Sequence, residues 1–137
     1  MTIRELLNLT KTLETKVHSA LAVPVSPPLS LGEVKVLEVL VSEEDPLPIR
    51  EIVARANLAQ SWVSTVVKGL EKRGWVKLQS DPNDGRVTTV AVTSAVAAGA
   101  RKALSRNALP VLMEIAPHAK KSEVEAAIKA LKLLASA

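Results

Sequence analysis

Residues 57–86 read NLAQSWVSTVVKGLEKRGWVKLQSDPNDGR, and this stretch predicts a helix that runs directly into a β-hairpin. The apolar residues of its first half recur at the i, i+3, i+4, i+7 spacing of one helical stripe, at Val63, Val66, Val67 and Leu70. Such a stripe must pack against a core. The other face carries short or flexible polar side chains, which are Gln60, Ser61, Ser64, Thr65, Lys68 and Lys72. Because side chains of these kinds reach base edges and phosphates, this face is typical of one that contacts a polar partner.

The hairpin is predicted from alternation and from turn chemistry. Gly74 is a typical helix-ending residue, and beyond it Val76 and Leu78 alternate with polar residues, as in a half-buried strand. The same alternation returns over residues 88–93. The intervening residues 81–86, DPNDGR, are dense in turn formers, so the two strands are predicted to pair antiparallel across a protruding loop. Helix, hairpin and loop together predict a winged helix.

Two further helices are predicted upstream of this unit. Ser30 and Glu33 have the spacing of a capping box, which would open a helix over residues 30–41. A shorter helix follows Pro48, with its apolar residues inward at Ile49, Ile52, Val53 and Ala56. A short turn at Asn57 joins it to the polar-faced helix. This is the helix-turn-helix arrangement, in which the second helix enters the DNA major groove.

Helices with apolar stripes are also predicted at both ends of the chain. Residues 2–21 form the first, with a capping box at Thr2 and Glu5. From Ser94 a helical pattern returns, which Pro110 must kink or interrupt, and Ser122 with Glu125 would cap a last helix. A small winged-helix core cannot cover these stripes, so we expect a homodimer that shares them.

The predicted fold is mainly α with a small antiparallel β-hairpin, in three parts. Residues 1–29 form an N-terminal dimerisation helix and a proline-rich linker that contains Pro24, Pro27 and Pro28. Residues 30–93 form the winged helix-turn-helix, and residues 94–137 form C-terminal dimerisation helices. A chain of 137 residues is long enough for one modest core, which a partner chain would complete.

Composition narrows the classes of function. The net charge is +4, and residues 57–77 hold four basic residues against one acidic residue, so most of the charge lies on the predicted recognition segment. There is no cysteine for a disulfide or a redox thiol, and no apolar run of membrane-spanning length or signal-peptide pattern, so we expect a cytoplasmic protein without membrane contact. Phosphate-binding loops, nucleophile motifs and paired carboxylates are missing from the sequence, which predicts a protein that is not an enzyme and needs no cofactor.

The sequence resembles the MarR family of winged-helix transcriptional regulators over nearly its whole length. Four stretches carry the resemblance, which are residues 29–31 (LSL), 60–64 (QSWVS), 70–76 (LEKRGWV) and 81–86 (DPNDGR) with the following strand through Val92 and Thr93. The resemblance implies an intertwined homodimer that binds a near-palindromic duplex and a cleft for a small anionic or aromatic effector. It also implies that Asp84 pairs with Arg86, which reaches into the minor groove. Two positions depart from the family pattern: Gly85 replaces a basic residue, and Ala59 replaces a helix-capping Ser or Thr.

We therefore predict a dimeric, sequence-specific regulator that binds double-stranded DNA, acting as a repressor that a small-molecule effector relieves. The predicted DNA contacts are Gln60, Ser61, Ser64, Thr65, Lys68, Lys72, Arg73, Lys77, Asp84 and Arg86. Among them Lys72, Arg73 and Lys77 are general phosphate contacts, at least one of which could instead be a helix C-terminal charge. The alternatives are a winged-helix module that binds protein and a ligand-binding or metal-storage dimer that does not read DNA.

The remaining aromatic and imidazole side chains have predicted roles of their own. Trp62 either flanks the core or lies against sugars and thymine methyl groups, and Trp75 is expected in the core. His18 and His118 could meet at the dimer interface as metal ligands or a pH switch. We expect instead exposed histidines at helix ends and no metal site.

Overall fold

The computed structural model of the chain describes residues 1–21 and 25–137, so the predicted break at Pro24 lies outside the described residues. Within them the chain has seven helices and three short strands. These elements form two compact units. One unit is the described part of Ala22–Ser105, and the other combines Met1–Leu21 with Arg106–Ala137.

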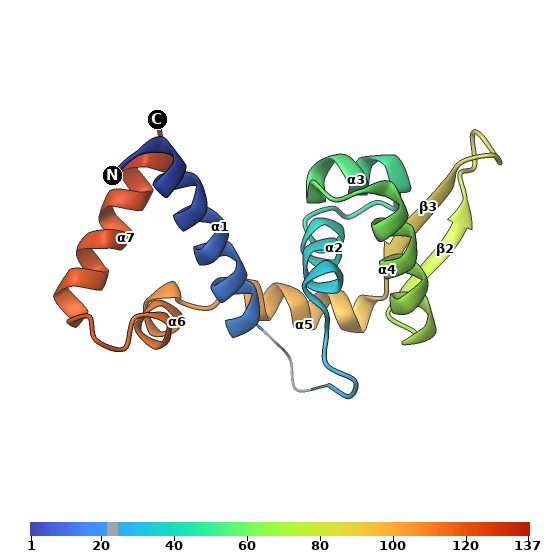
Figure 1. The fold of residues 1–137 in the computed structure, drawn as a ribbon. Helices are drawn as coiled ribbons and strands as arrows, with labels where there is room; N and C mark the ends of the chain where they lie inside the picture. Colours follow the sequence, from blue (N-terminus) through green and yellow to red (C-terminus); the bar gives the residue numbers. More distant parts are fainter. Residues whose placement is uncertain (22–24) are drawn as a thin grey trace. The chain divides into compact units, whose positions relative to one another are not determined.

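The first unit contains the predicted winged helix, residues 30–93, together with a helix from the predicted C-terminal segment (Figure 1). Its elements in chain order are α2 (Leu31–Val41), β1 (Leu47–Pro48), α3 (Ile49–Ala56), α4 (Gln60–Lys72), β2 (Val76–Ser80), β3 (Thr88–Val92) and α5 (Ser94–Leu104). Helices α2, α3 and α4 pack against one another, and α5 packs against α2. Their shared core is aliphatic, and its fully buried side chains are Val36, Ile52, Val63, Val67, Leu70 and Val90. The predicted inward stripes of α3 and α4 are thus confirmed.

Local chemistry sets the ends of these helices. The Ser30 hydroxyl accepts a hydrogen bond from the Glu33 amide at 3.1 Å, and the Glu33 carboxylate accepts one from the Ser30 amide, also at 3.1 Å, so the predicted capping box opens α2. Helix α4 ends at Lys72 with Arg73 as its C-cap, and the next residue, Gly74, has a φ of 74° in the left-handed region. The amides of Gly74 and Trp75 bond back to the carbonyls of Glu71 and Leu70, which is the Schellman arrangement.

The sheet has one strand more than the predicted hairpin. Strands β2 and β3 pair antiparallel, with Val76 opposite Val92 and Ser80 opposite Thr88, as expected. The missed strand, β1, pairs Leu47 with Val90 on the other side of β3. Two residues contain no periodic pattern to detect, so β1 exists only through its pairing with a strand that lies 40 residues further along the chain.

The second unit contains α1 (Ile3–Ala20), α6 (Ala108–Ile115) and α7 (Lys121–Ala135), with α6 contacting both of the others. Thr2 and Glu5 form the predicted capping box of α1. Large apolar side chains of this unit remain exposed in the single chain, namely Ile3, Leu6, Leu7 and Leu9 of α1 with Leu131, Leu133 and Leu134 of α7. In the part of the chain that is described, no helix combines the length and apolar character needed to cross a bilayer.

Two predicted helix boundaries in the C-terminal region were wrong. The interruption lies before Pro110, because α5 ends at Leu104 and α6 begins at Ala108 with Asn107 as its cap. Pro110 then sits in the first turn of α6, where its missing amide hydrogen costs no hydrogen bond and its ring does not meet a preceding turn.

The last helix begins at Lys121, one residue before the predicted Ser122 cap. Lys120 occupies the cap position, and its amide donates to the Glu123 carboxylate at 2.7 Å. Ser122 and Glu125 therefore do not form a capping box, because the helix already begins before them and Glu123 accepts the hydrogen bond of the cap residue's amide.

Candidate nucleic-acid interface

Helix α4 presents the predicted polar face to solvent. Gln60, Ser61, Thr65, Lys68 and Lys72 are exposed, and Ser64 is half-buried. The buried stripe on the opposite side of α4 holds this orientation, since it is anchored in the core of α2 and α3. The Thr65 hydroxyl donates to the Ser61 carbonyl at 3.0 Å, so its oxygen lone pairs still face outward.

The start of α4 has the departure noted in the sequence. Ala59 is the N-cap residue, with an extended backbone and no side-chain hydrogen bond to the first turn. The helix begins at Gln60, so its first amides have no side-chain acceptor from the cap position. Those amides can donate hydrogen bonds to a phosphate oxygen, since helix N-termini commonly bind phosphate.

The loop between β2 and β3, here called the wing, is folded by its aspartates. The Asp81 carboxylate accepts the amides of Asn83 at 2.7 Å and Asp84 at 3.3 Å, which closes a turn. Asp84 then accepts Nε of Arg86 at 3.1 Å and Nη2 at 3.3 Å, so the predicted pairing of Asp84 with Arg86 is confirmed. The Arg86 side chain is nevertheless 91% exposed. The turn therefore holds a cation outward at the tip of the wing.

This pairing affects the ionisation of Asp84. The guanidinium of Arg86, followed by the Arg86 amide that donates to the same carboxylate, holds the pKa of Asp84 below its ordinary value. Hydrogen bonds to the charged form favour it, so Asp84 is ionised at neutral pH and Arg86 keeps its partner.

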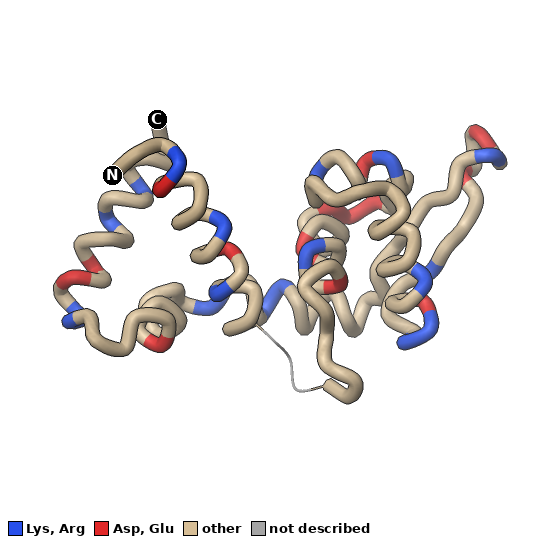
Figure 2. Tube along the Cα trace, in the orientation of Figure 1, with Lys and Arg blue, Asp and Glu red and all other residues tan. Residues whose placement is uncertain are grey.

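The basic residues around the wing and the end of α4 do not share one environment. Figure 2 shows Lys and Arg at the tip of the wing and at the C-terminal end of α4. Lys72 and Lys77 are exposed there. Arg73 differs, because its side chain is only 15% exposed and its guanidinium donates to Glu33 and to the carbonyls of Pro27 and Pro28. The prediction of a phosphate contact at Arg73 therefore gives way to an internal role, since its donors are already directed at protein oxygens.

Trp62 lies where α4 crosses the start of α2. Its ring is 44% exposed, and its Nε1 would lie 2.8 Å from a Cβ built on Gly32, so only glycine leaves room for the indole. Sequence reasoning left Trp62 between core and surface and did not single out Gly32. No local pattern marks this contact, because the two residues are 30 positions apart in the chain.

An open groove of about 870 Å³ follows one side of α4. Both tryptophans, Trp62 and Trp75, contribute to its wall together with Lys72 and Arg73. Residues 25–27, Ser30 and Glu33 form the opposite side. Aromatic surfaces beside cationic groups suit a planar anionic molecule.

Both histidines were expected to be exposed at helix ends, and only one of them is. His118 is exposed as expected, but His18 is buried in the second unit, so its position at a helix end did not predict its exposure. Across residues 1–21 and 25–137, no three His, Asp or Glu side chains gather closely enough to hold a metal ion.

Comparison with known proteins places this geometry in a family. Residues 29–88 match the model of the MarR family. The crystal structure of wild-type MarR from E. coli in the apo form aligns with a TM-score of 0.74 at 18% identity, covering 98% of this chain and 97% of that chain. A mutant of E. coli MarR solved with operator DNA aligns with a TM-score of 0.64 at 19% identity, covering 96% of this chain and 91% of that one.

A ligand-bound relative has the same fold. The PcaV transcriptional regulator from Streptomyces coelicolor, solved with its natural ligand, aligns with a TM-score of 0.63 at 20% identity over 100% of this chain and 94% of that chain. No curated protein sequence matches the chain. The resemblance to the MarR family is therefore confirmed: residues 29–88 match the family model, and the whole chain has the fold of E. coli MarR.

Proposed function

We propose that this protein is a homodimeric, sequence-specific regulator of transcription that represses from a near-palindromic operator until a small ligand releases it. One observation carries the proposal. A single rigid winged helix presents both an exposed polar face on α4 and a wing whose Arg86 is held outward by Asp84. Two separate polar features on one small domain, the face of α4 and the tip of the wing, indicate a surface that binds a large polar partner.

Each structural feature then has a role on DNA. Helix α4 would enter the major groove, where Gln60, Ser61, Ser64 and Thr65 read base edges. Lys68, Lys72 and Lys77 would contact phosphates and supply affinity rather than specificity. Arg86 would enter the minor groove, whose negative potential is greatest where the groove is narrow. Asp84 would orient Arg86 through the pair that the two residues form.

A second copy of the chain would cover the exposed apolar faces of α1 and α7. These faces hold seven large apolar side chains that are exposed in the single chain, more than scattered surface residues would explain. We keep residues 1–29 and 94–137 as the proposed dimerisation segments around residues 30–93. The two recognition helices of such a dimer should meet half-sites about 34 Å apart, one turn of the duplex.

The groove beside α4 is the proposed effector site. The names of two relatives guide the choice of ligand: PcaV was solved with its natural ligand, and BpsR from Bordetella bronchiseptica, which shares 17% identity and a TM-score of 0.60, is described as regulated by 6-hydroxynicotinic acid. A planar aromatic carboxylate would fit between Trp62 and Trp75 and face the positive charge of Lys72.

Selection of bound fragments from the host's genomic DNA tests the proposal. We expect enrichment of one near-palindromic motif, and an affinity for it whose logarithm falls by several units per tenfold rise in salt concentration. Equal affinity for every duplex would reduce the protein to a non-specific binder. No binding to any duplex would favour a module that recognises protein through the same face of α4.

A further inference from the structure

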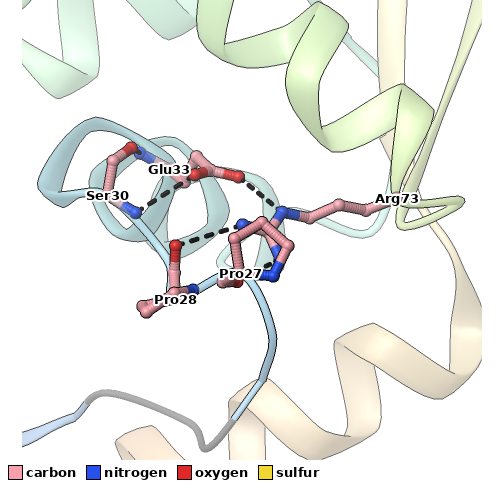
Figure 3. A network of polar contacts seen from close by, with 5 residues as sticks. All are labelled: Pro27, Pro28, Ser30, Glu33 and Arg73. Carbon is pink, nitrogen blue, oxygen red and sulfur yellow. Dashed lines mark hydrogen bonds and ion pairs between the residues drawn. The ribbon is translucent and has the colours of Figure 1, made fainter.

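Arg73 is the C-cap residue of α4 and the centre of a polar network (Figure 3). Its Nε donates to Glu33 Oε2 at 2.9 Å, its Nη1 to the Pro27 carbonyl at 2.7 Å, and its Nη2 to the Pro28 carbonyl at 3.1 Å. Its guanidinium carbon also lies 5.6 Å from the centre of the Trp75 ring. One side chain at the end of α4 thus holds hydrogen-bond acceptors that are 40 to 46 residues away in sequence.

Glu33 shares its two oxygens between two tasks. Oε1 accepts the Ser30 amide at 3.1 Å and so caps α2, while Oε2 accepts Arg73. The Glu33 side chain is only 13% exposed, so water and salt screen this ion pair less than they would screen a surface pair. The cap of α2 and the end of α4 are therefore joined through one carboxylate.

Residues 25–29 link this network to the chain that arrives from α1. Pro27 and Pro28 have no amide hydrogen, so their carbonyls are the backbone groups by which they can be held. The planar guanidinium offers several donors in fixed directions, which the compact ammonium of lysine does not. Arginine is thus the residue type suited to hold a carboxylate and two carbonyls together.

We propose that Arg73 is a positioning residue of the DNA-binding unit, which fixes residues 25–29 against the C-terminal end of α4 and does not touch DNA. The inference rests on the proposed function, because its consequence for affinity requires that α4 reads DNA. When the hydrogen bonds of Arg73, here called the anchor, are intact, residues 25–29 and α4 keep one arrangement relative to each other. When it is lost, the binding-competent arrangement is a smaller fraction of the population, so the observed affinity falls by that fraction.

The test compares Arg73→Met and Arg73→Lys with Lys72→Met, which removes an exposed charge at the adjacent position. Affinity for a duplex selected from genomic DNA is measured over a series of salt concentrations. Arg73→Met should weaken binding by about tenfold, the equivalent of one charged hydrogen bond, and leave the salt slope unchanged. Lys72→Met should reduce the slope by about one per recognition helix, since it removes a phosphate contact.

Arg73→Lys separates the two roles further. Lysine binds phosphate well, so it would restore affinity if Arg73 contacted DNA, but it cannot supply the planar set of donors and should not restore a positioning role. A reduced salt slope in Arg73→Met, or full affinity in Arg73→Lys, would overturn the proposal.

Hydrogen exchange tests the anchor without DNA. In Arg73→Lys, amides of the peptide spanning residues 25–30 should exchange faster, while α3 should exchange at the wild-type rate. Unchanged exchange over residues 25–30 would contradict the anchor. If Arg73→Met does not fold, Glu33→Gln provides the same test, because it replaces one of the two accepting oxygens with an NH2 group, which cannot accept from Ser30 or Arg73.

The two proposals fail in different ways. If the wild-type protein binds no duplex, the proposed function is wrong. The hydrogen-exchange measurement then decides by itself whether Arg73 holds residues 25–29. If the wild type binds DNA but Arg73→Met binds with equal affinity, the proposed function stands and the positioning role is lost.

Discussion

Arg73 and Arg86 have the same charge, and their surroundings give them opposite uses. The guanidinium of Arg73 is enclosed among protein oxygens, whereas that of Arg86 is 91% exposed and paired with one neighbouring carboxylate. An exposed pair contributes little to stability, because water and salt screen it. The Asp84 pair therefore serves to orient Arg86, and its value should be seen in DNA binding.

Arg86→Ala should accordingly weaken binding to the selected operator by about 1 to 3 kcal/mol without unfolding the protein. The cause is the loss of a cation that a compact turn holds in position for the minor groove. Titration with labelled duplex and far-UV circular dichroism measure the two effects. Arg106→Ala, an exposed arginine outside the winged helix, is the matched control and should bind as wild type. Unchanged affinity in Arg86→Ala would exclude the wing from recognition.

The same substitution should change the titration of Asp84. Arg86 lowers the pKa of this carboxyl, so the pair is intact above the ordinary aspartate value of about 3.9 and is lost as pH falls through the lower folded value. In Arg86→Ala the pKa of Asp84 should rise toward that ordinary value, which carboxyl NMR can follow. A pKa that does not move would mean that the backbone amide of residue 86 and the charge of Arg50, rather than the Arg86 guanidinium, set the ionisation of Asp84.

Gly32→Ala tests the contact between α2 and Trp62. The new Cβ would meet Nε1 of Trp62 at 2.8 Å and a methyl group of buried Val66 at 3.0 Å, so the indole must move outward. We expect a loss of roughly 1 to 3 kcal/mol of unfolding free energy, typical of overpacking, and a red-shifted tryptophan emission. Gly99→Ala is the control, since nothing lies within 4 Å of its Cβ, and it should stabilise α5 by up to about 1 kcal/mol. Equal stability of the two variants would show that Trp62 moves without cost.

At the scale of elements, α4 owes its position to packing rather than to strong end signals. Its N-cap is Ala59, which offers no side-chain acceptor, but its stripe of valines and Leu70 is buried against α2 and α3. Most helical stability in proteins comes from such tertiary packing. The uncapped first turn also leaves its amides available to a phosphate group.

Ala59→Ser should therefore stabilise the DNA-free protein by about 1 kcal/mol, because the serine hydroxyl can accept an amide of the first turn. Urea unfolding measures the change. Ala98→Ser is the control at an exposed position inside α5, where serine has a lower helix propensity than alanine and should destabilise slightly. If both variants lose stability, the first turn of α4 does not have the geometry of a capped helix.

At the scale of the whole molecule, burial within each unit is uneven. The winged helix has an aliphatic core with six side chains almost fully buried, whereas the second unit buries few large side chains and leaves leucines of α1 and α7 exposed. A unit with this distribution needs a partner surface, and a second copy is the one that the proposed function supplies.

Leu131→Glu should thus convert the proposed dimer into monomers, because a charge on a desolvated apolar surface is costly. Light scattering during size-exclusion chromatography measures the mass. Ser122→Glu introduces the same charge at an exposed position on the opposite side of α7 and should remain dimeric. A Leu131→Glu variant that stays dimeric would place the interface elsewhere.

The sequence by itself determined those features whose causes are local. The stripe of α4, the capping box at Ser30, the glycine end of α4 and the turn of the wing each depend on residues within one helical turn or one loop, so periodicity and turn chemistry predicted them. The exposed polar face of α4 follows from the same local geometry, whereas the pairing of Asp84 with Arg86 was expected from the resemblance to the MarR family.

Only the tertiary structure decided the features that join distant residues. Strand β1 forms because β3 pairs with it, Trp62 finds its place because Gly32 is opposite, and Arg73 becomes an anchor because Pro27 lies beside it across 46 positions of sequence. A charged side chain at a helix end looks the same in sequence whether it faces phosphate or a buried carboxylate. Its use depends on which groups the fold brings within hydrogen-bonding distance.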